Sequence, residues 1–374
     1  MLGGFLGAGK TTALIRLARH YVEAGLRVGI ITNDQAEGLV DTLAYREAGY
    51  TTEEIPSGCF CCHFEKLLEA SGRLADGLEP DIILAEPVGS CTDLVNAVIT
   101  PLRRLYTDRF EVAPYAVLLD PFRAEDALSA SGPTALSKKV TYLYKMQQNE
   151  ADVIVVNKVD QLDADARERV AALVAQNFPK AKAVFVSALT GAGFGDLVPL
   201  LSGTGVAGAN PAEVVYARYT EAEIALGWLN ARFVLEAAPP RNVSGAHSPW
   251  DGNEVLKAVA RSVREMLVLH GAQIAHFKMR LIDPSGREAA LHATRNDETP
   301  MLTRRLKDGV ERAALVINLR AEGSPDLLER SVRETMDGIA RERQLRVTVE
   351  RCDAFAPNPP VPPPPERNSV RASN

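Results

Sequence analysis

The chain has 374 residues, of which 46% are hydrophobic and 24% are charged, and its formal net charge is -6. A chain of this length can bury more than one hydrophobic core, so we expect two domains. The acidic balance argues against a nucleic-acid-binding protein, whose phosphate contacts usually require a basic excess. The sequence has no run of about 18 apolar residues and no basic-then-apolar leader. We therefore expect no membrane span and a cytoplasmic location.

The first half of the chain alternates apolar runs with helical patterns, from Lys10 to about Phe185. Nearly continuous apolar strands separated by amphipathic helices are typical of a parallel sheet covered on both faces. We therefore predict an α/β domain over residues 1–202 with a mostly parallel sheet covered by helices. The runs expected as strands are Arg27–Thr32, Asp81–Ala85, Tyr115–Leu119, Asp152–Val156 and Ala183–Val186.

A phosphate-binding pattern, G-x-x-x-x-G-K-[ST], covers Gly4–Thr11 at the start of this domain and predicts a P-loop NTPase. Glycines let the backbone amides turn toward phosphates, and the N-terminus of the following helix adds positive potential. Lys10 is expected to act as a catalytic residue on the outer phosphates, and the Thr11 hydroxyl to bind Mg²⁺. The predicted nucleotide contacts of this loop are Gly4, Gly7, Ala8, Gly9, Lys10, Thr11 and Thr12.

The stretch before the phosphate loop is short, because only Met1, Leu2 and Gly3 precede it. A P-loop normally follows a buried strand. We therefore expect that the first strand of the sheet is missing, or that the chain begins inside a longer reading frame.

Three of the five cysteines crowd into Cys59, Cys61 and Cys62. Such close neighbours do not readily form disulfides with one another, so in a reducing compartment the cluster favours metal binding or thiol chemistry. Thiolates suit zinc, cobalt or other late transition metals, and two or three sulfurs with a carboxylate such as Glu37 would make a tetrahedral site. The pattern leaves the ligand set open, because Cys62 can point away from the other two. Buried structural cysteines and redox chemistry are the alternatives.

The acidic residue expected to work with Mg²⁺ is Glu86. At about 3.3 Å per strand residue, Asp81 and Glu86 lie roughly 16 Å apart, so they cannot share one ion. Glu86 ends its strand beside the phosphate loop and is the predicted catalytic residue and Mg²⁺ ligand, whereas Asp81 only begins the strand. The Gly89 amide is expected to sense the γ-phosphate. Cys91 is expected to pack at a helix start, with a role in reporting on the switch as the alternative.

A base-recognition motif, Asn157-Lys158-Val159-Asp160, directly follows another apolar run. Asp160 can accept two hydrogen bonds from the ring N–H and the amine of guanine, a donor pair that adenine lacks. The loss of such a charged hydrogen bond costs roughly 1.5–3 kcal/mol, which favours GTP over ATP. Lys158 is expected to lie along the base and Asn157 to tie its loop to the phosphate loop. Ser187 and Ala188 are the predicted contacts to the guanine oxygen.

The second half of the chain has a different pattern. We expect a linker at 203–212, a smaller α+β domain with an antiparallel sheet at 213–355, and a disordered or polyproline-like proline-rich tail at 356–374. Its predicted strands are Trp228–Glu236, Ile274–Ile282, Ala313–Leu319 and Leu345–Glu350. Its predicted helices are Gly252–Leu269 and Pro325–Arg343.

These motifs together resemble the G3E family of P-loop GTPases, in particular its CobW-like metallochaperone branch. The resemblance covers roughly the first 200 residues and rests on five segments. It implies a slow GTPase that binds zinc, cobalt or nickel between its switch segments and delivers it to a client metalloprotein or a cofactor-synthesis enzyme. Carried over by position, the metal ligands are Cys61, Cys62 and Glu37, with Cys59 as an additional candidate. The five segments are Gly3–Thr12, Asn33–Asp41, Gly58–Cys62, Glu86–Gly89 and Asn157–Asp160.

The sequence departs from this family in its Pro-Val-Gly-Ser-Cys run after Glu86, its Asp34-Gln35-Ala36 segment and its lack of a histidine-rich stretch. These differences leave the identity of the metal and of the client protein open. Zinc is the metal that we expect first. We also expect the protein to form a homodimer. Two alternative functions remain. One is a GTPase that gates assembly of a corrinoid enzyme or metalloenzyme without carrying metal itself. The other is a non-catalytic interaction module.

Overall fold

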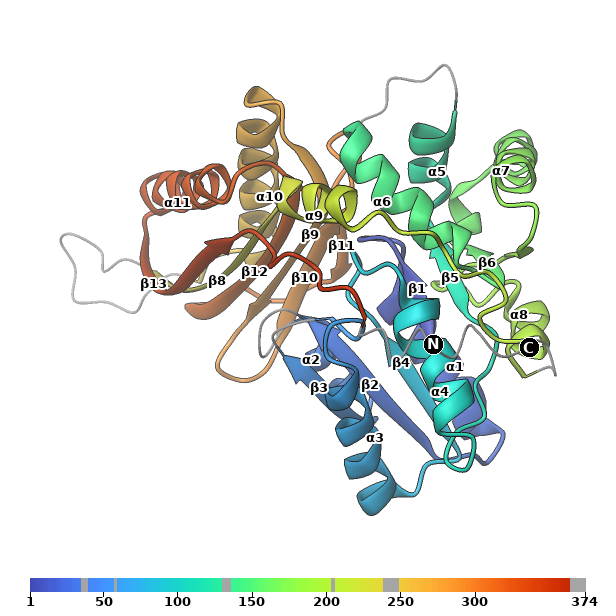
Figure 1. The fold of residues 1–374 in the computed structure, drawn as a ribbon. Coiled ribbons are helices and arrows are strands. Elements are labelled where there is room, and N and C mark those ends of the chain that lie inside the picture. Colours follow the sequence, from blue (N-terminus) through green and yellow to red (C-terminus); the bar gives the residue numbers. More distant parts are fainter. Residues whose placement is uncertain (35–39, 57–58, 130–135, 203–205, 238–248, 364–374) are drawn as a thin grey trace. The chain divides into compact units, whose positions relative to one another are not determined.

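The computed structural model describes residues 1–34, 40–56, 59–129, 136–202, 206–237 and 249–363 (Figure 1). By their internal contacts they form two compact units. Unit 1 comprises Met1–Glu223 with Asn358–Asn374, and unit 2 comprises Ile224–Pro357.

Unit 1 contains the predicted parallel sheet, in two hydrogen-bonded parts. One part has the strand order β1-β5-β6-β7 and the other has the order β3-β2-β4, and neighbouring strands within each described part are parallel. Strands β5 and β6 are apolar and fully buried, as strands covered on both faces must be. The strands are β1 Leu2–Gly4, β2 Val28–Asp34, β3 Thr51–Pro56, β4 Ile82–Glu86, β5 Ala116–Leu119, β6 Val153–Val156 and β7 Lys182–Phe185.

Helices connect these strands, and amphipathic helices such as α1 and α3 bury one face against the sheet. The helices of this half of the chain are α1 Lys10–Glu23, α2 Val40–Glu47, α3 Phe64–Leu78, the π-helix η1 Val95–Ile99, α4 Thr100–Leu105, α5 Pro121–Leu128, α6 Lys138–Asn149, the short 3₁₀-helix η2 Val159–Gln161, α7 Ala164–Asn177, α8 Phe194–Ser202 and α9 Tyr216–Ala225.

Two strand predictions for unit 1 were wrong. The first strand is present, because Leu2–Gly4 pairs in parallel with Ala116–Leu118. The alternative, that the chain begins inside a longer reading frame, stays a prediction. Strand β3 was missed because Thr51–Pro56 is mostly polar and lies at the edge of its sheet, where the hydrophobic signal is weak.

The predicted domain limits also differ from the contacts. The first unit extends to Glu223 rather than to 202, because α9 begins in it. Tyr219 of α9 is buried and its hydroxyl accepts a hydrogen bond from the Thr92 amide at 3.2 Å. Residues 358–363 group with unit 1 as well, so this described part of the tail is not independent of the domain, and residues 364–374 lie outside the described residues.

Unit 2 is the predicted α+β domain with an antiparallel sheet, of order β11-β10-β9-β12-β8-β13. Two of its strands, β10 and β11, were not predicted, because they are short and alternate apolar with polar residues only weakly. The elements are β8 Leu226–Ala237, α10 Gly252–Leu269, β9 Gln273–Ile282, β10 Glu288–Ala293, β11 Met301–Arg304, β12 Arg312–Glu322, α11 Pro325–Glu342 and β13 Leu345–Phe355.

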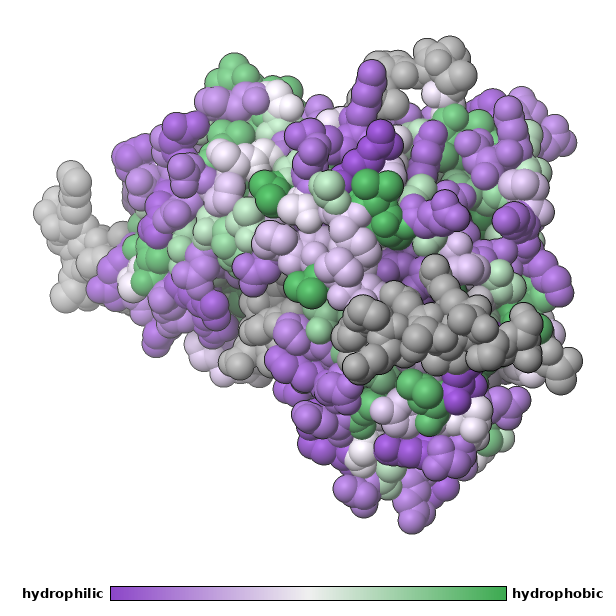
Figure 2. Space-filling model, in the orientation of Figure 1, coloured by the Kyte–Doolittle hydropathy of each residue, from purple (hydrophilic) through white to green (hydrophobic). Residues whose placement is uncertain are grey.

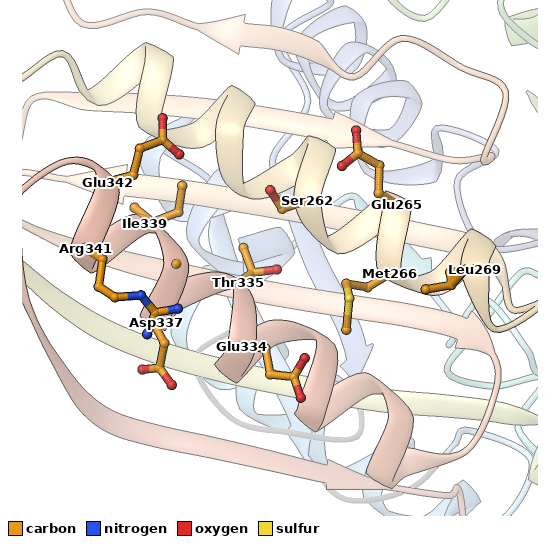
Figure 3. A pocket seen from close by; sticks show the side chains of 11 residues that line it. Ser262, Glu265, Met266, Leu269, Glu334, Thr335, Asp337, Ile339, Arg341 and Glu342 are labelled. Carbon is orange, nitrogen blue, oxygen red and sulfur yellow. The ribbon is translucent and has the colours of Figure 1, made fainter.

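A hollow lies between α10 and α11 of unit 2 (Figure 3). Its apolar part includes Met266 and Ile339, and acidic side chains such as Glu265 and Glu334 surround it. It offers neither a glycine-rich backbone nor a thiol, so it does not compete with unit 1 as a phosphate or soft-metal site.

The surface in Figure 2 is mostly hydrophilic, with scattered apolar side chains. Within the described ranges, no helix combines the length and apolar character needed to cross a bilayer.

Candidate nucleotide and metal site

The phosphate loop follows β1 and turns directly into α1. Gly7 and Gly9 have φ values of 80° and 94°, a left-handed conformation that glycine adopts without strain. A β-carbon on Gly9 would lie 2.4 Å from Nδ2 of Asn157, so no larger residue fits between this loop and the base motif. Gly4 joins β1 to the loop, Ala8 is buried, and Thr12 is exposed in the first turn of α1.

The side chains predicted to act on the outer phosphates and Mg²⁺ lie together. Lys10 is buried, and its Nζ donates to the Gly4 carbonyl at 3.0 Å and lies 4.0 Å from Glu86 Oε1. The Thr11 hydroxyl is 3.3 Å from each oxygen of Glu86. The Tyr45 hydroxyl of α2 also donates to Glu86, a contact that no sequence signal predicted.

Glu86 thus ends β4 beside the phosphate loop, and Asp81 lies at the other end of that strand. Asp81 pairs with Arg27, whose guanidinium holds the pKa of this carboxyl below its usual value. Its structural role is the one expected from its position. Hydroxyl and carboxylate oxygens are the donors that Mg²⁺ prefers, so Thr11 and Glu86 fit this ion chemically.

Gly89 follows β4 and closes over the phosphate-loop lysine. A β-carbon at this position would lie 3.0 Å from Lys10 Nζ and 2.7 Å from a methyl carbon of Leu6. The backbone of Gly89 therefore lies against the group that would meet the outer phosphate. Its carbonyl accepts a hydrogen bond from Gln147 of α6 at 2.9 Å.

The base motif is tied to the phosphate loop by Asn157, as predicted from the sequence. Its Nδ2 donates to the Ala8 carbonyl at 2.9 Å, and its Oδ1 accepts from the Ala188 amide at 2.8 Å. Ser187 is buried and its hydroxyl accepts from the Thr190 amide at 3.0 Å, which shapes this loop. One buried amide thus links three loops at the carboxyl edge of the sheet, where α/β domains bind ligands.

Asp160 is exposed in η2 at the same edge, with its carboxylate available to a base. Lys158 precedes it in a left-handed conformation and forms an ion pair with Asp120 at 2.5 Å. Asp120 also caps α5 through the Phe122 amide. We did not predict Asp120, although it directly follows β5 at the sheet edge where Glu86 ends β4, and that signal would have found it.

Arg16 is a second side chain that sequence reasoning missed. It reaches from α1 to the carbonyls of Ala188 and Leu189, each at 2.7 Å, and so holds the loop predicted to contact the guanine oxygen.

The cysteine loop lies between β3 and α3. The Cys62 and His63 amides both donate to the Cys59 carbonyl, at 3.1 and 3.0 Å, which closes a tight turn. The Sγ atoms of Cys59 and Cys61 are 2.6 Å apart, those of Cys59 and Cys62 are 3.0 Å apart, and those of Cys61 and Cys62 are 3.8 Å apart. All three sulfurs therefore converge, including that of Cys62, and His63 is outside this group.

The three thiols do not hold their protons equally. Hydrogen bonds from Cys61 and Cys62 lower the pKa of Cys59 well below its ordinary value. The hydrogen bond with Cys59 raises the pKa of Cys61, and it raises that of Cys62 to about 11. Cys59 is thus the most acidic thiol of the cluster, because hydrogen bonds from its neighbours favour its charged form.

Cys91 lies near this group but is not one of its three converging sulfurs, which among the described residues all come from the cysteine loop. It is buried, and burial together with the neighbouring Cys59 thiol raises its pKa. Its carbonyl accepts from the same Gln147 nitrogen that binds Gly89, at 2.8 Å. The short segment Gly89–Cys91 therefore connects the surroundings of the phosphate-loop lysine with those of the thiol cluster.

Residues 1–185 match the family model for the CobW/HypB/UreG nucleotide-binding domain. This half of the chain belongs to the CobW/HypB/UreG family.

Two curated relatives share this domain. The zinc chaperone CobW of Pseudomonas aeruginosa is 30% identical over 210 residues, which cover 48% of this chain and 53% of that protein. The zinc chaperone YeiR of Escherichia coli is 27% identical over 175 residues, or 45% of this chain and 48% of that protein. The chain thus spans about half the length of the curated relatives it matches.

Solved structures also resemble this chain. The Zn(II)-bound YjiA GTPase from E. coli has 16% identity and a TM-score of 0.36, with coverage of 90% of this chain and 96% of that one. HypB from Helicobacter pylori in complex with nickel has 18% identity and a TM-score of 0.39, with coverage of 55% of this chain and 90% of that one.

The sulfur group of this CobW/HypB/UreG domain suits a soft metal. At a Zn–S distance of about 2.3 Å, tetrahedral geometry places sulfurs about 3.8 Å apart. The Cys61–Cys62 separation already has that value, and the two shorter separations must open by about 1 Å. Glu37, the carboxylate implied by the resemblance, lies outside the described residues.

Proposed function

We propose that this protein is a GTPase metallochaperone, in which GTP binding and hydrolysis control a transition metal held by the cysteine loop. The observation that carries this proposal is the position of the segment Gly89–Cys91. Gly89 lies against Lys10, and Gln147 joins the Gly89 carbonyl to that of Cys91. Cys91 is buried, and burial together with the neighbouring Cys59 thiol raises its pKa. A γ-phosphate that moves this segment would thereby also change the positions of the cysteine sulfurs.

The nucleotide half of the mechanism follows from the side chains at the sheet edge. The loop amides and Lys10 bind the phosphates, and Asp160 selects guanine by accepting from its two donors. Mg²⁺, when bound, would neutralise developing charge on the phosphates, and Thr11 and Glu86 are the residues that would hold it. Asn157 holds the base loop and the phosphate loop in a fixed relative position, so base recognition and phosphate binding occur together.

The metal half of the mechanism follows from the sulfur group. A metal ion as cargo would meet the Cys59 thiolate first, and Cys61 and Cys62 would lose their protons on binding. Thermodynamic linkage is reciprocal. If a nucleotide changes the affinity of the protein for the metal, the metal changes the affinity for that nucleotide by the same factor. Hydrolysis would remove the γ-phosphate that Gly89 contacts, and the cysteine loop would then return to the conformation that it has in the GDP-bound protein.

Zinc is the proposed cargo, with cobalt or nickel as alternatives that thiolates also bind. The family match and the similarity to two zinc chaperones support a metal-handling GTPase. Slow hydrolysis, a cytoplasmic location, delivery to a client metalloprotein or cofactor-synthesis enzyme, and homodimer formation belong to the same proposal.

The test is a zinc titration of the full-length, reduced protein with a non-hydrolysable GTP analogue, with GDP and without nucleotide. We expect a zinc affinity that differs at least fivefold between the first two states, the lower end of typical couplings. Cys61→Ser should abolish this high-affinity binding, whereas Cys352→Ser in β13 of unit 2 should retain it. Equal affinity in all three states would exclude the coupled mechanism and favour a GTPase that gates assembly without carrying metal.

A further inference from the structure

The hollow between helices α10 and α11 of unit 2 is an open groove with a volume of about 750 Å³ (Figure 3). Its lining residues lie within Ser262–Leu269 of α10 and Glu334–Glu342 of α11, which is about two turns of each helix. The groove is too open for a small molecule, because small-molecule sites enclose most of the ligand's surface. Its form instead suits an elongated segment that lies along the two helices, such as a third helix.

The groove exists because Gly338 lies inside α11 without a side chain. A β-carbon at this position would meet no atom of a neighbouring element within 4 Å. Glycine is less favourable than alanine inside a helix, so the helix itself gains no stability from this residue. What Gly338 provides is open space between the helices, and Ser262, a small side chain on α10, lines the same space.

Apolar side chains line part of the groove. Ile339 is buried and Met266 is half-buried, whereas Leu269, at the end of α10, is 78% exposed. The removal of such apolar surface from water is the dominant favourable contribution to most protein association. These residues therefore favour a partner that carries an apolar stripe.

The charges along the groove are mostly acidic. Two of the acidic residues, Glu265 and Glu334, form no ion pair with another described residue. Their negative potential would attract lysine and arginine side chains and repel an acidic partner. The charged side chains that line the groove are all exposed, and only one is basic: Glu265, Glu334, Asp337, Arg341 and Glu342.

We infer that this groove of unit 2 binds a basic amphipathic helix of a partner protein. The apolar face of that helix would cover Met266 and Leu269 and fill the space above Gly338. Its lysine or arginine side chains would meet Glu265 and Glu334 at the edges of the groove. This mode of recognition uses apolar anchors at helical spacing for affinity and charges around them for specificity. It does not depend on the nucleotide or metal chemistry of unit 1.

The open space at Gly338 permits a steric test without any change of charge. Gly338→Trp places an indole in the groove, and it should fold because the new β-carbon meets no neighbouring element. Gly338→Ala adds one methyl group and leaves the groove open. Gly77→Trp is the matched control, because Gly77 is another helical glycine with open surroundings, in α3 of unit 1.

The probe is a labelled peptide of about 18 residues, built from leucine on one helical face and lysine on the other. Fluorescence anisotropy with the full chain measures its affinity. We expect Gly338→Trp to weaken binding about tenfold or more, and Gly338→Ala and Gly77→Trp to stay within about twofold of the natural protein. Unchanged circular dichroism establishes that the variants are folded. Equal affinity of Gly338→Trp and the natural protein would overturn the inference, and so would the absence of binding to the natural protein.

A second pair of variants tests the charges. We expect the double variant Glu265→Gln, Glu334→Gln to bind the lysine peptide more weakly, by about threefold or more at low salt. The double variant Glu69→Gln, Glu168→Gln removes two exposed acids of unit 1 and should bind as the natural protein does. Equal losses in both would show that net charge alone attracts the peptide, which would overturn the inference.

A second copy of this chain is the competing occupant of the groove. Sedimentation velocity distinguishes it from a partner helix. If the natural protein is a dimer that Gly338→Trp converts to a monomer, and the peptide binds both equally, the groove is an interface between copies and the inference is overturned.

Discussion

The side-chain nitrogen of Gln147 donates to the carbonyl of Cys91 at 2.8 Å and to that of Gly89 at 2.9 Å. Gly89 lies against Lys10 of the phosphate loop. Cys91 is buried, and burial together with the neighbouring Cys59 thiol raises its pKa. This short segment therefore connects the two halves of the proposed mechanism.

This connection predicts that Cys91→Ala will uncouple nucleotide and zinc. The expected result is a zinc affinity that differs less than twofold between the GTP-analogue and GDP states, against at least fivefold for the natural protein. Isothermal titration in each nucleotide state measures it. Cys352→Ala, in unit 2, is the matched control and should retain full coupling. A Cys91→Ala protein with undiminished coupling would show that the signal travels by another route.

Lys10→Ala should reduce the rate of GTP hydrolysis by at least about 100-fold. The ammonium group lies between the Gly4 carbonyl and Glu86, where no other described cation is placed to meet the outer phosphates. Phosphate release under saturating GTP measures the effect. Lys139→Ala, which removes an exposed ion pair with Glu221, should leave the rate unchanged. If Lys10→Ala hydrolysed GTP normally, the phosphate-loop assignment would be wrong.

Asp160→Asn should weaken GTP binding by about 10–150-fold, the equivalent of losing 1.5–3 kcal/mol. The amide would present a donor to the guanine amine, and it would instead suit xanthine, which has a carbonyl at that position. Competition binding with GTP and XTP measures the change in preference. Asp163→Asn is the control, because Asp163 caps α7 and asparagine caps a helix equally well. Retained GTP preference in Asp160→Asn would contradict this mode of base recognition.

Glu150→Gln should change how stability depends on pH. Glu150 is buried at the end of α6 and accepts hydrogen bonds from the Leu94 and Val95 amides at 2.7 and 3.2 Å and from the Thr92 hydroxyl at 2.8 Å. Burial raises the pKa of this carboxyl from 4.5 to about 7, with a smaller contribution from the nearby Asp93. The folded protein therefore keeps a proton that the unfolded chain loses.

Because the folded state binds more protons between pH 4.5 and about 7, its stability falls as pH rises through this window. The contribution of Glu150 is at most about 3 kcal/mol. Urea unfolding at pH 5 and pH 8 should show a smaller fall for Glu150→Gln than for the natural protein. Glu223, whose pKa burial raises to about 8, contributes a fall that both proteins share. An identical fall in both would refute a titrating Glu150, and the exposed Glu168→Gln is the control.

Local patterns in the chain were enough to predict the nucleotide site. A glycine-rich loop binds phosphates through its own backbone, so Gly4–Thr11 could be recognised from spacing alone. Glu86 and Asn157 were placed because parallel strands end at a common edge, and the structure confirms their contacts with Thr11 and Ala8. The same rule would have found Asp120, which follows β5.

The contacts between distant segments were not predictable in this way. Tyr45 reaches Glu86, Arg16 reaches the Ala188 carbonyl, and Gln147 reaches the Cys91 carbonyl only because packed helices and strands bring these segments together. No periodicity in the chain encodes which thiol will face which, since a side-chain direction depends on the neighbours that surround it. The residues that would bind phosphates and metal can be predicted from local spacing. The coupling between the two sites depends on long-range packing, which local spacing does not determine.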